Sequence, residues 1–154
     1  MAGQQHGMVA LDAAGEPVRP AILWNDTAAA PQARSLVEEL GGPQSCAEKT
    51  GSVMVASFTG AKLRWLREVE SENAERTRAV VLPHDYLTWH LGGGSGEYTT
   101  DHGDASGTGY YSPQARAFVP ELVERYLGKR VTLPRIAAPA AHLSRRRNCC
   151  RYRG

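Results

Sequence analysis

Residues 8–24 read MVALDAAGEPVRPAILW, two short apolar runs joined by a turn. The first run, residues 8–12, and the second, residues 18–24, each have the length and composition of a short strand. Gly15 lies between them, where a tight turn can require a positive φ. This stretch therefore predicts a β-hairpin close to the start of the chain.

Helical patterns follow the hairpin and alternate with short strands. Residues 28–40 carry apolar side chains at helical spacing, Asp26 or Thr27 can cap this helix, and residues 41–43 (Gly-Gly-Pro) end it. The other predicted helices carry residues 63–69, 71–77, 85–91 and 119–127, and further strands are predicted at residues 79–82 and 97–100. The mixture indicates an α/β or α+β fold.

The length and composition are those of one folded domain. The chain has 154 residues, of which 42% are hydrophobic, and a net charge of +2, so the low hydrophobicity and high charge of a disordered chain are absent. No apolar run approaches the roughly 20 residues that a membrane-spanning helix needs, and residues 1–11 lack the pattern of a signal peptide. The three cysteines lack the spacing of a zinc site or a disulfide scaffold. We expect a cytoplasmic protein with free thiols and no membrane partner.

The charge is distributed unevenly along the chain. Residues 142–154 contain five arginines and no acid, a charge of +5, which leaves −3 for residues 1–141. We interpret residues 1–141 as the folded domain and residues 142–154 as a basic tail that is disordered or encoded out of frame. Clustered arginines give salt-sensitive, nonspecific binding to nucleic acid, and the tail has a single aromatic residue, so we expect no specific nucleic-acid partner.

Two polar segments near the start of the chain are candidates for ligand binding. Residues 3–7 read GQQHG, whose side chains can hydrogen-bond to a polyhydroxylated ligand while the glycines let the backbone approach it. The alternative is a polar strand end in solvent. Residues 24–26, Trp-Asn-Asp, follow an apolar strand, where α/β proteins often bind ligands, and the alternative is that Asp26 only caps the next helix.

A third candidate is the segment DHGDASGT, residues 101–108. Asp101, His102 and Asp104 offer the oxygen and nitrogen atoms of a metal site. The alternative is a loop whose Asp, Ser and Thr side chains cap a helix and bond to the backbone.

From the sequence, the other ionisable residues are expected to have ordinary structural roles. His84 is interpreted as a surface or packing histidine, and Lys62 as a solvated charge on a helix. The sequence contains no Walker-type loop, no protein-kinase signature and no GxSxG elbow.

Five segments together resemble the xylulokinases of the FGGY family of carbohydrate kinases. They are GQQHG (3–7), PAILWND (20–26), FTGAKLRW (58–65), LPHDYL (82–87) and DHGDASGT (101–108), in family order, and the resemblance extends from about residue 3 to about residue 139. It implies part of an N-terminal lobe of ribonuclease-H-like, actin-like fold, with hairpin strands and packed helices.

The resemblance also implies a reaction. Xylulokinases transfer the γ-phosphoryl group of ATP to D-xylulose, using Mg²⁺ and an Asp base, and form xylulose 5-phosphate. Gln5 and His6 match the sugar-contacting segment, and Ser57 matches a further sugar-side position. Gln4 and Asp26, from the two polar segments described above, are additional candidates for contact with the sugar. ATP and Mg²⁺ are thus cofactors of the complete enzyme, and neither is expected to bind this chain tightly.

The resemblance weakens at both ends of the chain. Family members begin earlier, with a turn that faces the ATP phosphates, and their catalytic Asp follows the last matching residues. We therefore expect a fragment that is inactive alone and that can self-associate through exposed sheet edges. The alternatives are a non-catalytic carbohydrate-binding module or another FGGY kinase of ketoses or polyols.

Overall fold

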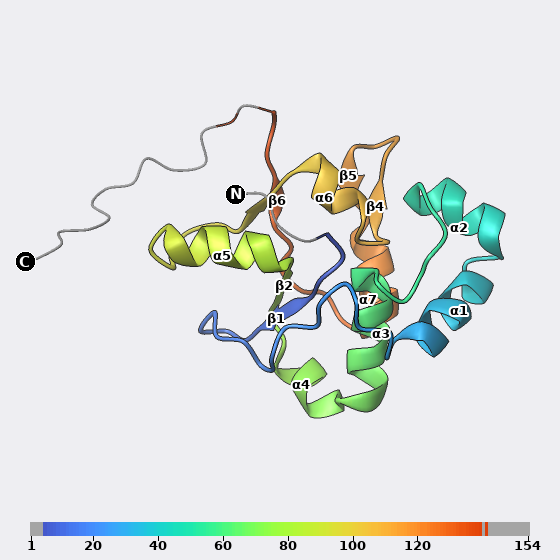
Figure 1. Ribbon diagram of the computed structural model, residues 1–154, viewed down its shortest axis with the longest axis horizontal. Coiled ribbons are helices and arrows are strands. Elements are labelled where there is room, and N and C mark those ends of the chain that lie inside the picture. The colour runs from blue at the N-terminus through green and yellow to red at the C-terminus, as the bar shows by residue number, and fades with distance from the viewer. Residues whose placement is uncertain (1–4, 140, 142–154) are drawn as a thin grey trace, which may run out of the picture.

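A computed structural model describes residues 5–139 and 141 of the chain. Its elements are shown in Figure 1 and are, in order, β1 (Val9–Leu11), α1 (Ala30–Glu39), α2 (Pro43–Thr50), α3 (Thr59–Val69), α4 (Ser71–Arg76), β2 (Ala79–Val81), α5 (Pro83–Leu91), β3 (Thr99–Thr100), α6 (His102–Ser106), β4 (Tyr111–Ser112), β5 (Ala117–Phe118), α7 (Pro120–Leu127) and β6 (Arg135–Ile136). The mixed α/β class predicted from the sequence is confirmed.

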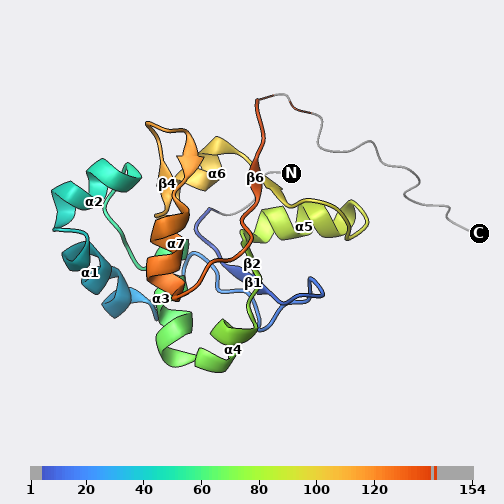
Figure 2. The ribbon, with the colours of Figure 1, turned by 180° about the vertical axis from the view of Figure 1, so that it is seen from behind.

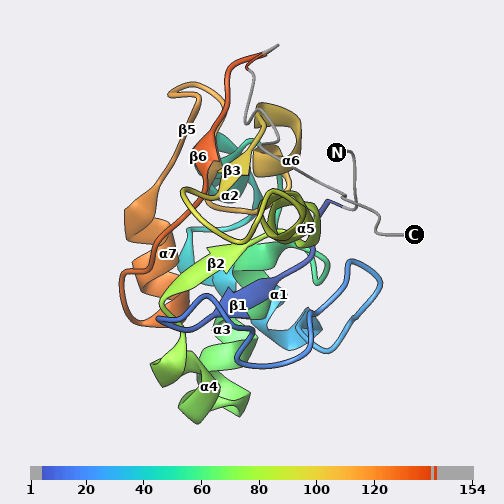
Figure 3. The same ribbon diagram turned by 90° about the vertical axis from the view of Figure 1, so that its left-hand side faces the viewer.

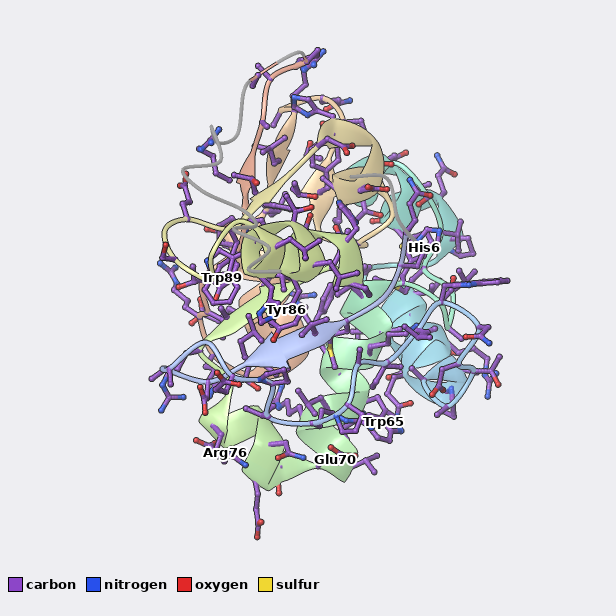
Figure 4. The ribbon with its side chains drawn as sticks, turned by 60° about the vertical axis from the view of Figure 1, so that its left-hand side comes forward. His6, Trp65, Glu70, Arg76, Tyr86 and Trp89 are labelled. Atoms are coloured by element: carbon purple, nitrogen blue, oxygen red, sulfur yellow. The ribbon has the colours of Figure 1, made fainter. Side chains whose placement is uncertain are left out.

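A short antiparallel ribbon of β1 and β2 lies at the centre of the fold. The register pairs Val9 with Val81 and Leu11 with Ala79. Helix α5 lies on one side of the ribbon and α3 and α4 lie on the other (Figure 3). Tyr86 extends from α5 onto the ribbon and packs against its buried side chains (Figure 4). The ribbon is thus covered by helices on both faces.

The predicted hairpin is only partly formed. Gly15 adopts φ +81° in the turn, as expected, and the backbones of Met8 and Ile22 exchange two hydrogen bonds. However, residues 18–24 do not form a strand, and β1 has its regular partner in β2. Pro17 and Pro20 explain the difference, since neither has the backbone N–H that a continuous ladder requires.

Helix α3 forms the centre of the hydrophobic core. It packs between α1 and α7 (Figures 1 and 2), and its Leu63 and Leu66 side chains are fully buried. A Cβ atom at Gly60 would lie 2.9 Å from the ring of Tyr126 on α7. The glycine therefore allows these two helices to approach closely.

One prediction about a helix end is wrong, and one helix was not predicted from the sequence. Helix α1 has Ala29 at its N-cap and no capping side chain, whereas Asp26 accepts a hydrogen bond from the backbone N–H of Ala28 (2.8 Å). Pro31 in the first turn reduces the need for a cap, because it has no N–H to satisfy. Residues 41–43 end α1 as predicted, but Pro43 also begins α2, a helix that the sequence pattern did not predict.

Two smaller strand pairs complete the fold. Strands β3 and β6 pair in parallel, and β4 and β5 pair in antiparallel fashion. Helix α7 ends at Gly128 (φ +89°), as predicted. None of the helices in the described residues is long and apolar enough to cross a membrane.

Candidate functional site

Three of the segments singled out from the sequence meet at one junction. The hydroxyl of Thr59 donates a hydrogen bond to the carbonyl of Gly7 (3.0 Å), and this bond is buried. The backbone N–H of Gly60 donates to the carbonyl of Thr108 (2.8 Å). The start of α3 therefore ties the GQQHG segment to the end of the DHGDASGT segment.

His6 is held at this junction by two contacts. Its Nδ1 donates to the carbonyl of Gly107 (2.7 Å), and its ring stacks on Phe58 with centroids 4.9 Å apart. The backbone of His6 is left-handed (φ +70°), which is uncommon for a residue other than glycine. Because a carbonyl can only accept, Nδ1 carries the proton, and the Nε2 of a neutral imidazole remains an acceptor. Figure 4 shows His6 near the start of the described chain.

The close approach of the His6 ring to the backbone requires a glycine at position 107. A Cβ atom at Gly107 would lie 2.5 Å from both Cε1 and Nδ1 of the His6 ring. The glycine therefore allows the imidazole to approach the backbone closely enough for its hydrogen bond.

Gln5 lies beside the same segment, and its Nε2 donates to the carbonyl of Gly103 (2.7 Å). The described contacts leave its Oε1 available as an acceptor. Gln4, the other glutamine of the motif, lies outside the described residues.

Lys62 bonds to the backbone of Ser57 and is influenced by the charge of Asp26. The Lys62 side chain is fully buried and donates to the carbonyls of Ala56 (2.9 Å) and Ser57 (2.6 Å). Burial lowers the pKa of Lys62 to about 8, although the charge of Asp26 acts in the opposite direction. Asp26 itself is exposed. The prediction of a solvated Lys62 is wrong, because the lysine instead fixes the backbone just before Phe58.

The DHGDASGT segment forms helix α6. Asp101 Oδ1 accepts from the backbone N–H of Asp104 (3.0 Å) and caps the helix, and the Thr108 hydroxyl bonds to the carbonyl of Ala105 (2.7 Å). This confirms the alternative in which these side chains cap a helix. His102, one of the suggested metal ligands, has its Nδ1 2.8 Å from the hydroxyl of Tyr111.

His84 on α5, and not His102, lies beside the α6 carboxylate of Asp104. Its Nε2 lies 2.8 Å from Asp85 Oδ1 and 3.0 Å from Asp104 Oδ2, and only 5% of the residue is exposed. Burial lowers the pKa of His84, but the close Asp85 carboxylate and the charges of Asp104 and Asp101 outweigh this, so its pKa is raised. No sequence pattern predicts this contact, because His84 and Asp104 are far apart along the chain.

Helices α5 and α6 also border a pocket of about 350 Å³. Its walls include His84, Thr88 and Asp101, together with the segment around Ala138. Thr100, in the segment before α6, also lines this pocket.

Comparisons with known proteins agree on one family. Residues 1–145 match the model of the N-terminal domain of the FGGY family of carbohydrate kinases. The xylulose kinase of Streptomyces coelicolor is 55% identical over 137 residues, which are 89% of this chain and 28% of that protein. The xylulose kinase of Streptomyces rubiginosus is 53% identical over the same shares. The chain thus spans little more than a quarter of these relatives.

Solved structures give the same result. The xylulose kinase of Bifidobacterium adolescentis superposes with a TM-score of 0.84 at 36% identity, covering 90% of this chain and 35% of that one. The gluconate kinase of Lactobacillus acidophilus superposes with a TM-score of 0.72 at 28% identity, covering 88% of this chain and 27% of that one. These likenesses agree with an incomplete N-terminal lobe.

Proposed function

Because the chain belongs to the FGGY family of carbohydrate kinases, we propose that it forms the sugar-facing part of a kinase that phosphorylates D-xylulose. The Streptomyces relatives that are more than half identical to it are both xylulose kinases, which favours this sugar. Since the chain matches little more than a quarter of their length, phosphoryl transfer is proposed for the larger enzyme of which this segment is a part. The 154-residue chain alone is expected to show no xylulose-dependent ATP consumption.

The proposal depends most on the junction around His6. A sugar needs donors and acceptors in fixed directions, and this imidazole is oriented by the Gly107 carbonyl and the Phe58 ring. Its Nε2 can accept a hydrogen bond from a sugar hydroxyl, and Gln5 Oε1 can accept a second. The unusual backbone of His6 agrees with a functional role, because strained residues are often found at binding sites.

Asp26 and Ser57 would contribute a second side of the same site. The buried ammonium group of Lys62 bonds to the Ser57 carbonyl and is influenced by the charge of Asp26, and Ser57 directly precedes Phe58. In this arrangement Lys62 positions the loop without touching the sugar. Gln4 is included as a sugar-side residue by its place in the GQQHG motif.

ATP and Mg²⁺ supply the phosphoryl group and neutralise its charge in such kinases. Lys62, the buried cation of this site, does not fit a phosphate, because its ammonium group is bonded to two backbone carbonyls. We therefore assign no residue of this chain to ATP or Mg²⁺. The described residues bind and orient the sugar, which is the positioning part of the rate enhancement.

A sugar acid or a polyol is the competing substrate, because the fold also matches a gluconate kinase. The discriminating measurement is a substrate comparison in a complete enzyme. Residues 5–139 would replace the matching segment of the Streptomyces coelicolor xylulose kinase, and ATP consumption would be followed with D-xylulose, gluconate and glycerol.

We expect this chimera to prefer D-xylulose and His6→Ala to lower its kcat/KM about 100-fold or more, as expected for a lost positioning contact. His90→Ala, an exposed change on α5, serves as the control and should leave kcat/KM unchanged. A folded chimera that prefers gluconate, or in which His6→Ala has no effect, would contradict the proposal.

A further inference from the structure

The cluster formed by His84, Asp101 and Asp104 has no part in the proposed sugar site. One ligand atom from each of these residues can be chosen so that all three atoms lie within 4.8 Å of one another. The residues come from α5 and from the start of α6, two elements joined by the loop and strand between residues 91 and 102. The fold therefore brings together a nitrogen and two oxygen donors that are separated in the sequence.

Together with the neighbouring Asp85, the cluster contains more negative charge than its one basic side chain can balance. Asp85, Asp101 and Asp104 all lie around the single imidazole of His84. Within residues 5–139 and 141, His84 is the one basic side chain within 4.0 Å of any of these three carboxylates. Even a protonated imidazole would leave a net charge of −2, which attracts a cation.

A buried oxygen within the cluster has an ion-pair contact with His84 but no well-aligned hydrogen bond. The Asp85 side chain is fully buried, and its Oδ2 accepts from the backbone N–H of Leu82 (3.0 Å). Its Oδ1 lies 2.8 Å from His84 Nε2, but no described group donates to it with hydrogen-bond geometry. A buried carboxylate oxygen that lacks a well-aligned hydrogen bond is costly, and a further cation nearby would reduce that cost.

We propose that His84, Asp101 and Asp104 bind a divalent first-row transition-metal ion, with Asp85 as the neighbouring charge that balances it. Imidazole and carboxylate ligands together suit Mn²⁺ or Zn²⁺ better than Mg²⁺, which prefers oxygen alone. Ligands on opposite sides of such an ion lie about 4.2 Å apart, so ligand atoms that already lie within 4.8 Å of one another need only a small adjustment. Its Oδ1 caps α6, and Oδ2 remains for the ion.

The surroundings allow an ion to enter and to keep water ligands. The pocket of about 350 Å³ is lined by His84 and Asp101 and opens to solvent. Binding there would fix the start of α6, whose Gly103 carbonyl holds Gln5 and whose C-cap Gly107 holds His6. The ion would thus order the same segment that the proposed sugar site uses, although its binding does not depend on that proposal.

Mn²⁺ is the probe that tests this site, because it binds oxygen and imidazole ligands in preference to the thiolates of the cysteines. The tag-free 154-residue chain is freed of metal with a chelator and titrated with MnCl₂, and free Mn²⁺ is followed by its electron paramagnetic resonance signal. We expect saturable binding of one ion per chain. Asp101→Asn should weaken it about 10-fold or more, while α6 stays intact because Asn is also a good N-cap.

Glu121→Gln on α7 removes the same charge elsewhere and is the control, with an expected change below about twofold. The proposal is overturned if binding does not saturate, if Asp101→Asn binds like the original chain, or if Glu121→Gln weakens binding equally. His84→Gln should abolish binding. Should that variant not fold, paramagnetic broadening in the unmodified chain decides instead: amides of residues 84–86 and 101–107 must broaden first, and broadening centred elsewhere overturns the proposal.

Discussion

The two ends of α6 are held in different ways. At its C-terminal end, Gly107 and Thr108 join His6 and α3 through neutral hydrogen bonds and close approach of the backbone. At its N-terminal end, Asp101 and Asp104 face a buried histidine in a cluster dominated by charge. The first arrangement fixes a geometry suited to a polar ligand, and the second fixes the helix that carries it. Close packing should therefore hold the C-terminal end of α6 in place, and charge interactions should hold its N-terminal end.

His84→Leu should have the largest effect, because it removes the basic side chain beside the buried Asp85 carboxylate and the partly buried Asp104 carboxylate. Breaking a buried ion pair in this way costs about 3–5 kcal/mol. The free energy of unfolding, measured by urea denaturation with chelator present, should fall by that amount. His90→Leu, on the same helix but exposed, should change it by less than about 0.5 kcal/mol. A similar small loss for both variants would show that the charged end does not hold α6.

Lys62 on α3 is a fully buried charge on the C-terminal side of this comparison, and it predicts a pH dependence. Its pKa is lowered to about 8, so between pH 8 and about 10.5 the folded chain releases a proton that the unfolded chain retains. The free energy of unfolding should therefore rise with pH in this window, by on the order of 2 kcal/mol. The burial penalty is present in full below pH 8.

Lys62→Met provides the matched control, because it keeps the length of the side chain and removes the titrating group. Stability curves at pH 7.5, 9 and 10.5, values chosen to bracket the window from about 8 to about 10.5, should differ in slope between the two proteins. Equal slopes would mean that Lys62 is solvated after all.

Gly107→Ala should have a smaller effect on stability, of about 1–2 kcal/mol, because the added methyl group would overlap the His6 ring. The ring should leave Phe58, and its proton NMR signals should lose the shift caused by stacking. Gly103→Ala is the control, because its Cβ would meet only the flexible Asp101 carboxylate, at 3.1 Å. Unchanged His6 signals in Gly107→Ala would show that close packing against Gly107 does not hold the C-terminal end of α6.

Much of the fold follows from local sequence. The apolar spacing of α3 and α7 and the glycine after α7 predict those helices, since a helical period and a C-cap are local properties. The sequence pattern does not predict α2 and α6 as helices, because each is short and lies next to glycines. The strand expected at residues 18–24 is interrupted because of Pro17 and Pro20.

The site could be predicted only in part. The GQQHG motif indicated His6, but the burial of Lys62 and the pairing of His84 with Asp104 depend on contacts between distant segments. No local pattern distinguishes a solvated lysine from one that donates to a preceding loop. The same limit explains why the sequence does not place His84 beside the α6 carboxylates.

The central claim is that the junction around His6 faces a sugar, and a titration of the ¹⁵N-labelled chain with D-xylulose tests it most directly. A site with contacts on one side only should bind weakly, with a Kd above about 1 mM. The account predicts that amides of residues 5–7, 57–60 and 103–108 shift together along one saturation curve, and that His6→Ala abolishes the shifts. Shifts confined to other regions, or identical shifts in His6→Ala, would contradict it.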